Sequence, residues 1–490
     1  MSRVLRSAVV GMALLIGLTA VGVAAPGSAS AAEVPEGFVY REGMRLMLDG
    51  RPYRPVGFNS FGLTGCATGR PYTQAQMDAY FGGLPPDGLT RTWAFERWGM
   101  DAVDMVVETA ERHGQRLILV LTGSGLGGGC ESDDKDAAWY ASGYRDRYLP
   151  WLRRAVERHK DSPAIAMWEI INEPGHQSTV DATTMKRFLD AAAAEIKAID
   201  PHHLVESGTL AEYTPGTADY AYVHSGPDID VASLHEYDYD PAHPLSRHLP
   251  KTLSRMYTIN KPMIIGEVGI VAGPGCGVSL EERNRALMEK ADGYFLSGVA
   301  GVMLWNYTPT PADDCSLSIR GTYPATGQPD PLVAAVRTYT PPPPVTPPAS
   351  SGQLVAKHDG KCLDVKDRST ANGAAVQQWG CTTGTHQRFR FEPTDSGFYR
   401  IVATHSGKCL DVSQQSQDLR APVVQWDCWG GANQQFRFEP AGDGYYRLIT
   451  RHSVQCLALA GASTANGAQV IQYECRNDIA NDHFKFRVRA

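Results

Sequence analysis

The stretch Ala164-Ile-Ala-Met-Trp-Glu-Ile-Ile-Asn-Glu-Pro174 is a short apolar run that ends in a cluster of polar side chains. Such short and nearly unbroken apolar runs are typical of parallel strands, because helices cover both faces of a parallel sheet. Similar runs recur upstream and downstream of this stretch. We therefore expect strands at Arg54–Asn59, Leu89–Ala94, Arg116–Thr122, Ala164–Ile171, Leu204–Gly208, Val231–His235, Met263–Glu267 and Gly301–Trp305.

Amphipathic stretches separate these predicted strands, as at Met100–His113, Tyr144–His159, Met185–Ile199 and Leu280–Leu296. Eight strands that alternate with helices predict an α/β fold, namely a (β/α)₈ TIM barrel. A doubly wound open sheet is the alternative fold, although no G-x-G-x-x-G motif follows a predicted strand. In a (β/α)₈ barrel the active site lies at the carboxyl ends of the strands.

The first residues of the chain predict export. Arg3 and Arg6 precede an apolar run, and Ala29-Ser-Ala31 fits the small-residue pattern of a signal-peptidase site. We expect a signal peptide over residues 1–31 and a secreted, extracellular protein. An uncleaved membrane anchor is the alternative, but glycines interrupt the run and no later stretch is apolar enough to span a bilayer, so no membrane partner is expected.

Charge and cysteine content narrow the functional class further. The net charge of −7 and the absence of a basic run argue against nucleic acid as a partner. Ten cysteines fit an oxidising compartment, and no C-x-x-C spacing indicates zinc. Six of them fall into three equally spaced pairs, and for the other four we favour one of the possible pairings. The expected disulfides are Cys362–Cys381, Cys409–Cys428, Cys456–Cys475, Cys66–Cys130 and Cys276–Cys315.

A proline-rich segment, Pro341-Pro-Pro-Pro-Val-Thr-Pro-Pro348, divides the chain. Prolines prevent both helix continuation and ladder pairing, so the segment should be an extended, semi-rigid spacer. Beyond it, a unit opens three times, at Lys361, Lys408 and Gln455, with Cys-Leu next in each case. A fixed period of short β-like units predicts equivalent subunits around one core. The expected parts are a signal peptide (1–31), a catalytic barrel (33–340), a linker (341–351) and an all-β domain (352–490).

Two acidic residues end predicted strands that face each other across the barrel mouth. Hydrolysis of a glycosidic bond needs one carboxyl that protonates the leaving oxygen and another that stays ionised and attacks the anomeric carbon. We assign Glu173 as acid/base and Glu267 as nucleophile, roughly 5–5.5 Å apart, which is the separation in a retaining mechanism. The structural alternative for Glu173 is a carboxylate that caps the next helix.

Five further side chains at strand ends suit the same reaction. Asn172 would hydrogen-bond the sugar 2-hydroxyl, and His235 would orient the acid/base or bind a hydroxyl. Arg91 and Tyr237 would stabilise the ionised nucleophile and keep its pKa low. Trp305 would stack against the sugar ring. A glycosidase of this kind is expected to need no cofactor, and no metal site is expected, because no H-E-x-x-H spacing is present.

These residues together resemble glycoside hydrolase family 5 over roughly residues 43–339. The resemblance rests on Asn172-Glu-Pro174 after an apolar strand, on His235-x-Tyr237, on Ile264-Ile-Gly-Glu267 and on Trp305 at the end of the last strand. It implies a retaining β-glycosidase of the clan A barrels. Carried over by position, it implies acid/base catalysis by Glu173 and nucleophilic catalysis by Glu267.

Two segments point to a substrate within that family. Arg91-Thr-Trp-Ala-Phe95 and His203-Leu-Val-Glu-Ser207 are similar to plant and fungal endo-β-1,4-mannanases. Mannanases tend to carry Tyr-Trp after the first strand, where this chain has Asn59-Ser-Phe61. The two similar segments nevertheless favour β-1,4-mannan as the substrate. The alternatives are disaccharide-releasing β-glucosidase activity on flavonoid rutinosides, as in some members with a similar tail, and hydrolysis of β-glucan.

The tail, residues 352–490, resembles the ricin-type β-trefoil of carbohydrate-binding module family 13. Such pockets bind a sugar with an aromatic platform, a carboxylate and amides. Matched by position, the pocket residues are Asp364, Gln377, Trp379 and Gln387 in the first repeat, and Asp411, Trp426, Asn433 and Gln434 in the second. The third repeat has Ala458 in place of the aspartate, so we expect two working pockets.

The sequence thus predicts a secreted, monomeric glycosidase with a polysaccharide or glycoside substrate and a carbohydrate ligand for its tail. A rival hypothesis from another functional class is a secreted lectin whose barrel is only an inactive scaffold. Both glutamates and their polar neighbours favour the enzyme.

Overall fold

The computed structural model describes residues 34–475 and 485–489, except 67, 125–129, 131–134, 176–179, 212–218, 241–244, 247 and 395–396. The predicted signal peptide lies outside the described residues. No helix in the described part of the chain is both long and apolar enough to cross a membrane.

Eight parallel strands form the first large sheet, in the order β8-β7-β6-β5-β4-β11-β10-β9. A parallel bridge between Glu206 and Val231 joins the two outer strands, so that the sheet closes into a barrel. The strands are β4 (Val56–Asn59), β5 (Leu89–Trp93), β6 (Arg116–Val120), β7 (Ile165–Glu169), β8 (Leu204–Glu206), β9 (Ala232–Glu236), β10 (Met263–Val268) and β11 (Gly301–Leu304). Every predicted strand is present, and the predicted TIM barrel is confirmed.

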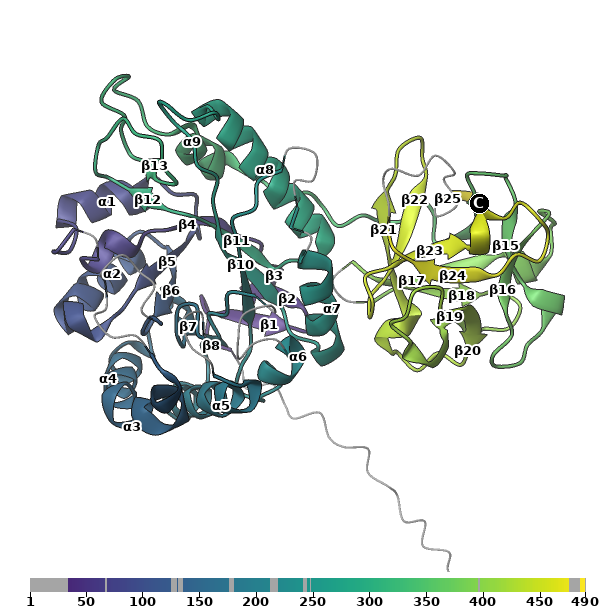
Figure 1. The fold of residues 1–490 in the computed structure, drawn as a ribbon, viewed down its shortest axis with the longest axis horizontal. Coiled ribbons are helices and arrows are strands. Elements are labelled where there is room, and N and C mark those ends of the chain that lie inside the picture. The colour runs from purple at the N-terminus through teal and green to yellow at the C-terminus, as the bar shows by residue number, and fades with distance from the viewer. Residues whose placement is uncertain are drawn as a thin grey trace, which may run out of the picture. The chain divides into compact units, whose positions relative to one another are not determined.

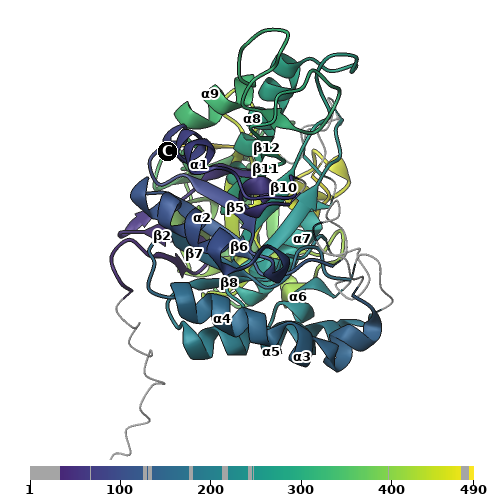
Figure 2. The ribbon, with the colours of Figure 1, turned by 90° about the vertical axis from the view of Figure 1, so that its left-hand side faces the viewer.

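Helices surround the barrel strands (Figures 1 and 2). They are α1 (Gln74–Gly82), α2 (Met100–Arg112), α3 (Tyr144–Arg147), α4 (Leu149–His159), α5 (Ala182–Ile199), α6 (Tyr220–Val223), α7 (Leu249–Ile259), α8 (Leu280–Ser297) and α9 (Pro331–Thr338). The single helix expected at Tyr144–His159 is divided into α3 and α4. Pro150, the second residue of α4, explains the division, because proline fits the first turn of a helix but cannot continue one.

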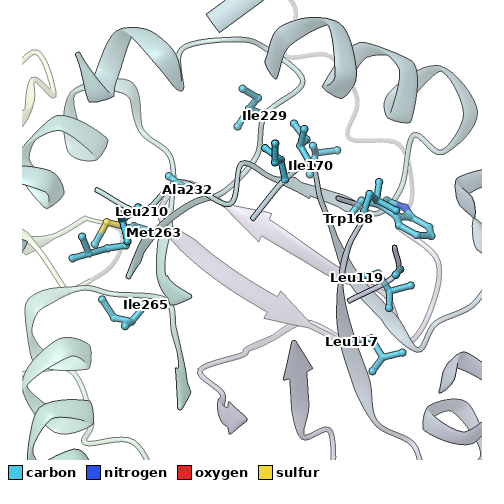
Figure 3. Packing of buried hydrophobic residues seen from close by; sticks show 14 of the residues in the cluster. Leu117, Leu119, Trp168, Ile170, Leu210, Ile229, Ala232, Met263 and Ile265 are labelled. Carbon is cyan, nitrogen blue, oxygen red and sulfur yellow. The ribbon is translucent and has the colours of Figure 1, made fainter. Parts of the chain in front are cut away.

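The barrel strands alternate between two apolar layers. Leu117 and Leu119 of β6 and Trp168 of β7 pack outward against the helices (Figure 3). Ile118 and Met167, on the opposite face of the same strands, belong to the interior layer. This alternation is what a strand period of two residues requires.

The interior apolar layer lies near the amino-terminal ends of the strands. A small antiparallel sheet contributes Val39, Leu46 and Leu48 to this layer. Its strands are β1 (Val39–Glu42), β2 (Arg45–Leu48) and β3 (Arg51–Pro52). Two residues beyond the interior-facing Leu89 and Met167, the next inward positions hold Arg91 and Glu169. The carboxyl ends of the strands therefore carry a polar layer.

The C-terminal part is a twelve-stranded antiparallel sheet built from three repeats of four strands. Strands β14, β17, β18, β21, β22 and β25 pair in a closed ring, and the other six form three hairpins. The strands are β14 (Ser351–Ala356), β15 (Cys362–Val365), β16 (Val376–Trp379), β17 (Phe389–Pro393), β18 (Tyr399–Ala403), β19 (Cys409–Val412), β20 (Val423–Trp426), β21 (Gln435–Pro440), β22 (Tyr446–Thr450), β23 (Cys456–Leu459), β24 (Val470–Tyr473) and β25 (Phe486–Arg489). Phe391, Phe438 and Phe486 are buried in one shared core, as the repeat predicts.

All ten cysteines are paired in the structure, in the five pairs that the sequence favours. Three of these disulfides join the first hairpin strand of a trefoil repeat to the segment directly after the second hairpin strand. Cys66–Cys130 joins the segment after β4 to the segment after β6. Cys276–Cys315 joins the loops that follow β10 and β11, and the second of these loops also contains the short strands β12 (Tyr307–Thr308) and β13 (Ile319–Arg320).

Candidate active site

All seven barrel residues proposed from the sequence lie at the carboxyl ends of five strands. They are Arg91 on β5, Asn172 and Glu173 after β7, His235 on β9 with Tyr237 just beyond it, Glu267 on β10 and Trp305 after β11. Six of them are linked by the contacts described below, and Trp305 lies at the edge of the group.

The turn that carries Glu173 is held by backbone hydrogen bonds. Glu173 has a φ of 49°, which is uncommon for a residue with a Cβ and costs about 1–3 kcal/mol. Its N–H donates to the carbonyl of Gly208 at 2.8 Å, and the N–H of Asn172 donates to Thr122 at 2.8 Å. His235 Nδ1 lies 2.8 Å from Glu173 Oε1. The neighbouring strands therefore fix both the backbone and the carboxyl of this residue.

Each carboxylate oxygen of Glu267 accepts a hydrogen bond. Arg91 Nη1 donates to Oε1 at 2.7 Å, and the Tyr237 hydroxyl donates to Oε2 at 2.5 Å. Burial nevertheless raises the pKa of Glu267, and the charge of Glu173 adds to this, while His235, Arg91 and Tyr237 oppose it. The expectation that Arg91 and Tyr237 keep this pKa low is wrong in its net direction, because the loss of water outweighs the donors.

The two glutamates converge at one point. One oxygen of Glu173, one nitrogen of His235 and one oxygen of Glu267 all lie within 4.8 Å of one another. Two carboxylates and an imidazole are also groups that bind metal ions. Here, however, the Arg91 guanidinium already supplies positive charge next to Glu267. The arrangement thus suits two carboxyls that act on the same bond.

Arg91 connects Glu267 to two residues that were given no catalytic role from the sequence. Its guanidinium donates to both oxygens of Glu169, at 2.6 and 2.5 Å, and to Asn59 Oδ1 at 2.9 Å. It also donates to Asn172 Oδ1 at 2.7 Å. Asn59 and Glu169 end β4 and β7, so the rule that found the other residues, polar side chains at strand ends, also applies to them.

Aromatic rings border the two glutamates. Tyr237 is 39% exposed although its hydroxyl is buried against Glu267, so its ring faces solvent. Trp305 is half-buried and stacks on Phe61 with ring centroids 5.2 Å apart. Trp93, in contrast, is buried with the Arg91 guanidinium 4.6 Å from its ring centroid. Tyr237 and Trp305 are therefore accessible to a sugar, whereas Trp93 packs beneath Arg91.

The first trefoil repeat brings three of its four predicted pocket residues into contact. The buried Asp364 accepts hydrogen bonds from Gln377 Nε2 at 3.0 Å and from Gln387 Nε2 at 2.8 Å. Trp379 is 43% exposed. His386 Nε2, which the sequence analysis missed, lies 3.2 Å from Asp364 Oδ2. Its position directly before Gln387, where the second repeat has an asparagine, was the available signal.

The second repeat has a related arrangement. Asp411 is buried and accepts from Gln434 Nε2 at 2.9 Å, while Asn433 donates to the carbonyl of the residue after Asp411 at 3.1 Å. Burial raises the pKa of Asp411. Trp426 is 44% exposed, and Trp429, which the sequence analysis missed, is 54% exposed. An exposed ring next to a buried carboxylate is the combination that sugar pockets use.

The third repeat has apolar side chains at the corresponding position. Asp364 and Asp411 each stand opposite a residue of the next strand, Gln377 and Val424 respectively. In the third repeat Ala458 stands opposite Ile471. Neither residue of this described pair carries a carboxylate that could anchor a hydroxyl group.

Two family profiles match this sequence. Residues 153–240 match the profile described as glycoside hydrolase family 5 β-mannosidase-like. Residues 346–426 and 385–473 match the profile described as ricin-type β-trefoil lectin domain-like. The first match includes Asn172, Glu173, His235 and Tyr237, and the second includes both trefoil pockets.

Curated relatives and solved structures include several mannanases. Mannan endo-1,4-β-mannosidase 2 of Oryza sativa subsp. japonica is 29% identical, over 49% of this chain and 69% of that protein. Mannan endo-1,4-β-mannosidase 8 of the same plant is 27% identical, over 55% and 91%. The endo-1,4-β-mannanase structure from Rhizomucor miehei is 18% identical and covers 62% of this chain and all of that one, with a TM-score of 0.48.

The fold and the site thus define an O-glycosyl hydrolase with a (β/α)₈ catalytic barrel and a β-trefoil. More particularly, the barrel resembles the glycoside hydrolase family 5, mannosidase-like type over residues 153–240, and the C-terminal part resembles a ricin-type β-trefoil lectin domain. The rival hypothesis of a lectin without an enzyme is set aside.

Proposed function

We propose that this protein is a secreted, retaining β-glycosidase that hydrolyses β-1,4-mannan. The observation that carries the proposal is the convergence of Glu173 and Glu267, with oxygens within 4.8 Å of each other. Retaining enzymes hold the two carboxyls at about 5–5.5 Å, and inverting enzymes at about 6.5–9.5 Å to admit a water molecule. The mannosidase-like profile and the names of the relatives favour mannan over rutinosides or β-glucan.

In the first step, a carboxylate oxygen of Glu267 attacks the anomeric carbon while the bond from that carbon to the leaving oxygen breaks. Glu173 gives its proton to the leaving oxygen, so the released sugar departs as an alcohol. The products are a glycosyl ester on Glu267 and an ionised Glu173. The donors from Arg91 and Tyr237 orient the attacking carboxylate.

In the second step, Glu173 removes a proton from water, whose oxygen attacks the same carbon as the ester bond to Glu267 breaks. Two inversions leave the product with the configuration of the substrate. Asn172 is positioned to hydrogen-bond the 2-hydroxyl, and His235 holds the Glu173 carboxyl at 2.8 Å throughout. Trp305 offers its half-buried ring to the sugar.

The tail would keep the enzyme on its substrate. Two trefoil pockets with a carboxylate, amides and an exposed tryptophan would bind a carbohydrate and raise the local substrate concentration through tethering. We assign residues 1–31 to a signal peptide, 33–340 to the barrel, 341–351 to the linker and 352–490 to the trefoil. Five disulfides fit an extracellular protein.

The decisive experiment compares the wild type with Glu173→Gly and Glu267→Gly on mannan, hesperidin-type rutinosides and cellulose, with the product anomer followed by NMR. We expect β-configured mannan fragments from the wild type and a loss of turnover of 10³-fold or more in each variant. Azide should restore cleavage of an activated substrate in both variants. The product should be the α-glycosyl azide with Glu267→Gly and the β-glycosyl azide with Glu173→Gly.

Each part of the proposal has its own contrary result. Initial release of the α-anomer from mannan would overturn the retaining mechanism. Release of a disaccharide from rutinosides, with mannan untouched, would replace the substrate but not the two carboxyl roles. Full turnover by either glycine variant would overturn the assignment of that glutamate.

A further inference from the structure

A third carboxyl lies behind the site, next to Glu169. Glu206 ends β8, directly opposite Glu169 of β7 in the parallel register, and both side chains are fully buried. Together with Glu267, three carboxyls therefore surround the single guanidinium of Arg91. If all three were ionised, the buried group would carry two uncompensated negative charges, a costly arrangement away from water.

The hydrogen bonds show where a proton would relieve this charge. Glu169 accepts two donors from Arg91, and Glu267 accepts one from Arg91 and one from Tyr237, so both suit the ionised form. Glu206 Oε1 accepts the N–H of Gly208 at 2.9 Å. Glu206 Oε2 is buried and receives no donor among the described residues. An oxygen that lacks a donor is satisfied if it carries a proton and donates itself.

The Glu169 carboxylate lies beside this oxygen as an acceptor. Gly208 lies against both carboxyl groups. Its N–H donates to Glu206, and a Cβ built on it would lie 2.7 Å from Glu169 Oε1. Burial raises the pKa of Glu206 well above its ordinary value, and the charge of Glu169 adds to this rise. The carbonyl of Gly208 in turn accepts the N–H of Glu173.

We propose that Glu206 is a protonated positioning residue, which donates its carboxyl proton to Glu169 and thereby holds Arg91 against the nucleophile Glu267. The donated hydrogen bond partly neutralises Glu169, so this carboxylate draws Arg91 less strongly away from Glu267. Without this donor, Glu169 would attract the Arg91 guanidinium more strongly and draw it away from Glu267. The ionised form of Glu267 would then be less stabilised. This inference rests on the proposed role of Glu267.

The test compares two variants of similar size in the full-length protein. Glu206→Gln keeps a neutral side chain that can donate a hydrogen bond. Its kcat should stay within about twofold of the wild-type value, and its pH profile should keep the wild-type position. Glu206→Met removes the donor. We expect kcat on mannan to fall on the order of tenfold or more, with little change in KM. The acidic limb of kcat/KM should move to higher pH, because a less stabilised Glu267 binds its proton more tightly.

Infrared spectroscopy supplies a readout that needs no substrate. The wild type at neutral pH should show the carbonyl stretch of the protonated Glu206 carboxyl, and Glu206→Gln should lose this band while that of the protonated acid/base Glu173 remains. A wild-type pH profile in Glu206→Met, equal impairment of both variants, or no band lost in Glu206→Gln would overturn the proposal. If Glu206→Met fails to fold, the infrared band and the kinetics of Glu206→Gln still test the proposal. If mannan is not the substrate, the band is unaffected, so the two failures can be told apart.

Discussion

At the scale of single residues, the pKa of the proposed nucleophile, Glu267, is set by a balance between burial and nearby hydrogen-bond donors and charges. Glu267 is 3% exposed, and the loss of water favours its protonated, unreactive form. Arg91, His235 and Tyr237 act in the opposite direction. A small change in any of these donors should therefore change the pH range in which the enzyme works.

Tyr237→Phe tests this balance. The substitution removes the hydroxyl that donates to Glu267 Oε2 and keeps the ring. Because that donor lowers the pKa of Glu267, its loss should raise the pKa and move the acidic limb of kcat/KM to higher pH. A hydrogen bond to a charged group is worth about 1.5–3 kcal/mol, which corresponds to a shift of about one to two pH units.

The measurement is a pH profile of kcat/KM for the variant and the wild type. Tyr222→Phe is the matched control, because Tyr222 is 40% exposed on α6 and should leave the profile unchanged. A limb that stays in place or moves to lower pH in Tyr237→Phe would show that the hydroxyl does not stabilise the ionised nucleophile.

At the scale of secondary-structure elements, the turn after β8 supports the turn after β7. Gly208 has a φ of 73°, and its carbonyl accepts the N–H of Glu173. A Cβ at this position would lie 1.8 Å from the carbonyl oxygen of Ile171, an overlap with backbone that cannot move aside easily. The catalytic turn therefore depends on a glycine in the neighbouring segment.

Gly208→Ala should destabilise the protein and disturb the site together. The left-handed conformation alone costs a residue with a Cβ about 1–3 kcal/mol, and the clash with Ile171 adds to this. Gly275→Ala is the control, since Gly275 has a φ of 82° but nothing within 4 Å of its Cβ position. We expect the control to lose only the conformational part. Equal melting temperatures and equal kcat in the two variants would refute the argument.

The loops after β10 and β11 form a second element-level unit. Cys276–Cys315 joins them, and an antiparallel bridge pairs Ala272 with Ser316. These loops begin directly after the strands that carry Glu267 and Trp305. Their cross-link should therefore matter for stability and for the alignment of the site.

Replacing Cys276 and Cys315 by serine should lower the free energy of unfolding by about 4 kcal/mol, as loop-closure entropy predicts for this spacing of 39 residues. We also expect kcat/KM to fall, because the flanking loops gain freedom. The matched variant replaces Cys456 and Cys475 of the trefoil, where barrel activity should persist. Calorimetry and kinetics on a soluble substrate check both effects, and unchanged kinetics in the first variant would separate these loops from catalysis.

At the scale of the whole molecule, the described residues hold the proposed catalytic centre in the barrel and two proposed carbohydrate pockets in the trefoil. The barrel holds the two glutamates in a buried polar layer, whereas the trefoil presents Trp379 and Trp426 on its surface. The proposed division of labour is hydrolysis by the barrel and retention on the polymer by the trefoil.

The double variant Asp364→Ala, Asp411→Ala should separate these two activities. Binding to insoluble mannan in a pull-down should be lost, because both anchoring carboxylates are gone. Hydrolysis of soluble substrate should be unchanged, and hydrolysis of insoluble mannan should fall several-fold as the effective concentration drops. Asp443→Ala is the control, since this aspartate between β21 and β22 is 81% exposed and outside both pockets. Undiminished pull-down by the double variant would contradict the assignment of the pockets.

Much of the architecture was predictable from local sequence patterns. Runs such as Arg116–Thr122 are typical of parallel strands buried on both faces, and the recurring cysteines indicate the trefoil repeats. The barrel rule then located Glu173, Glu267 and their neighbours at strand ends. The division at Pro150 was missed because the apolar period continues through it, although proline chemistry was a sufficient signal.

The sequence by itself determined which side chains would reach the open end of the barrel, because strand period and strand ends are local properties of the chain. Only the tertiary structure decided how those side chains share charge and protons. The contacts of Arg91 with Glu169 and Glu267, and the position of Glu206 behind them, join strands far apart in sequence. The net rise in the pKa of Glu267 likewise depends on how completely the fold removes water, which no local pattern records.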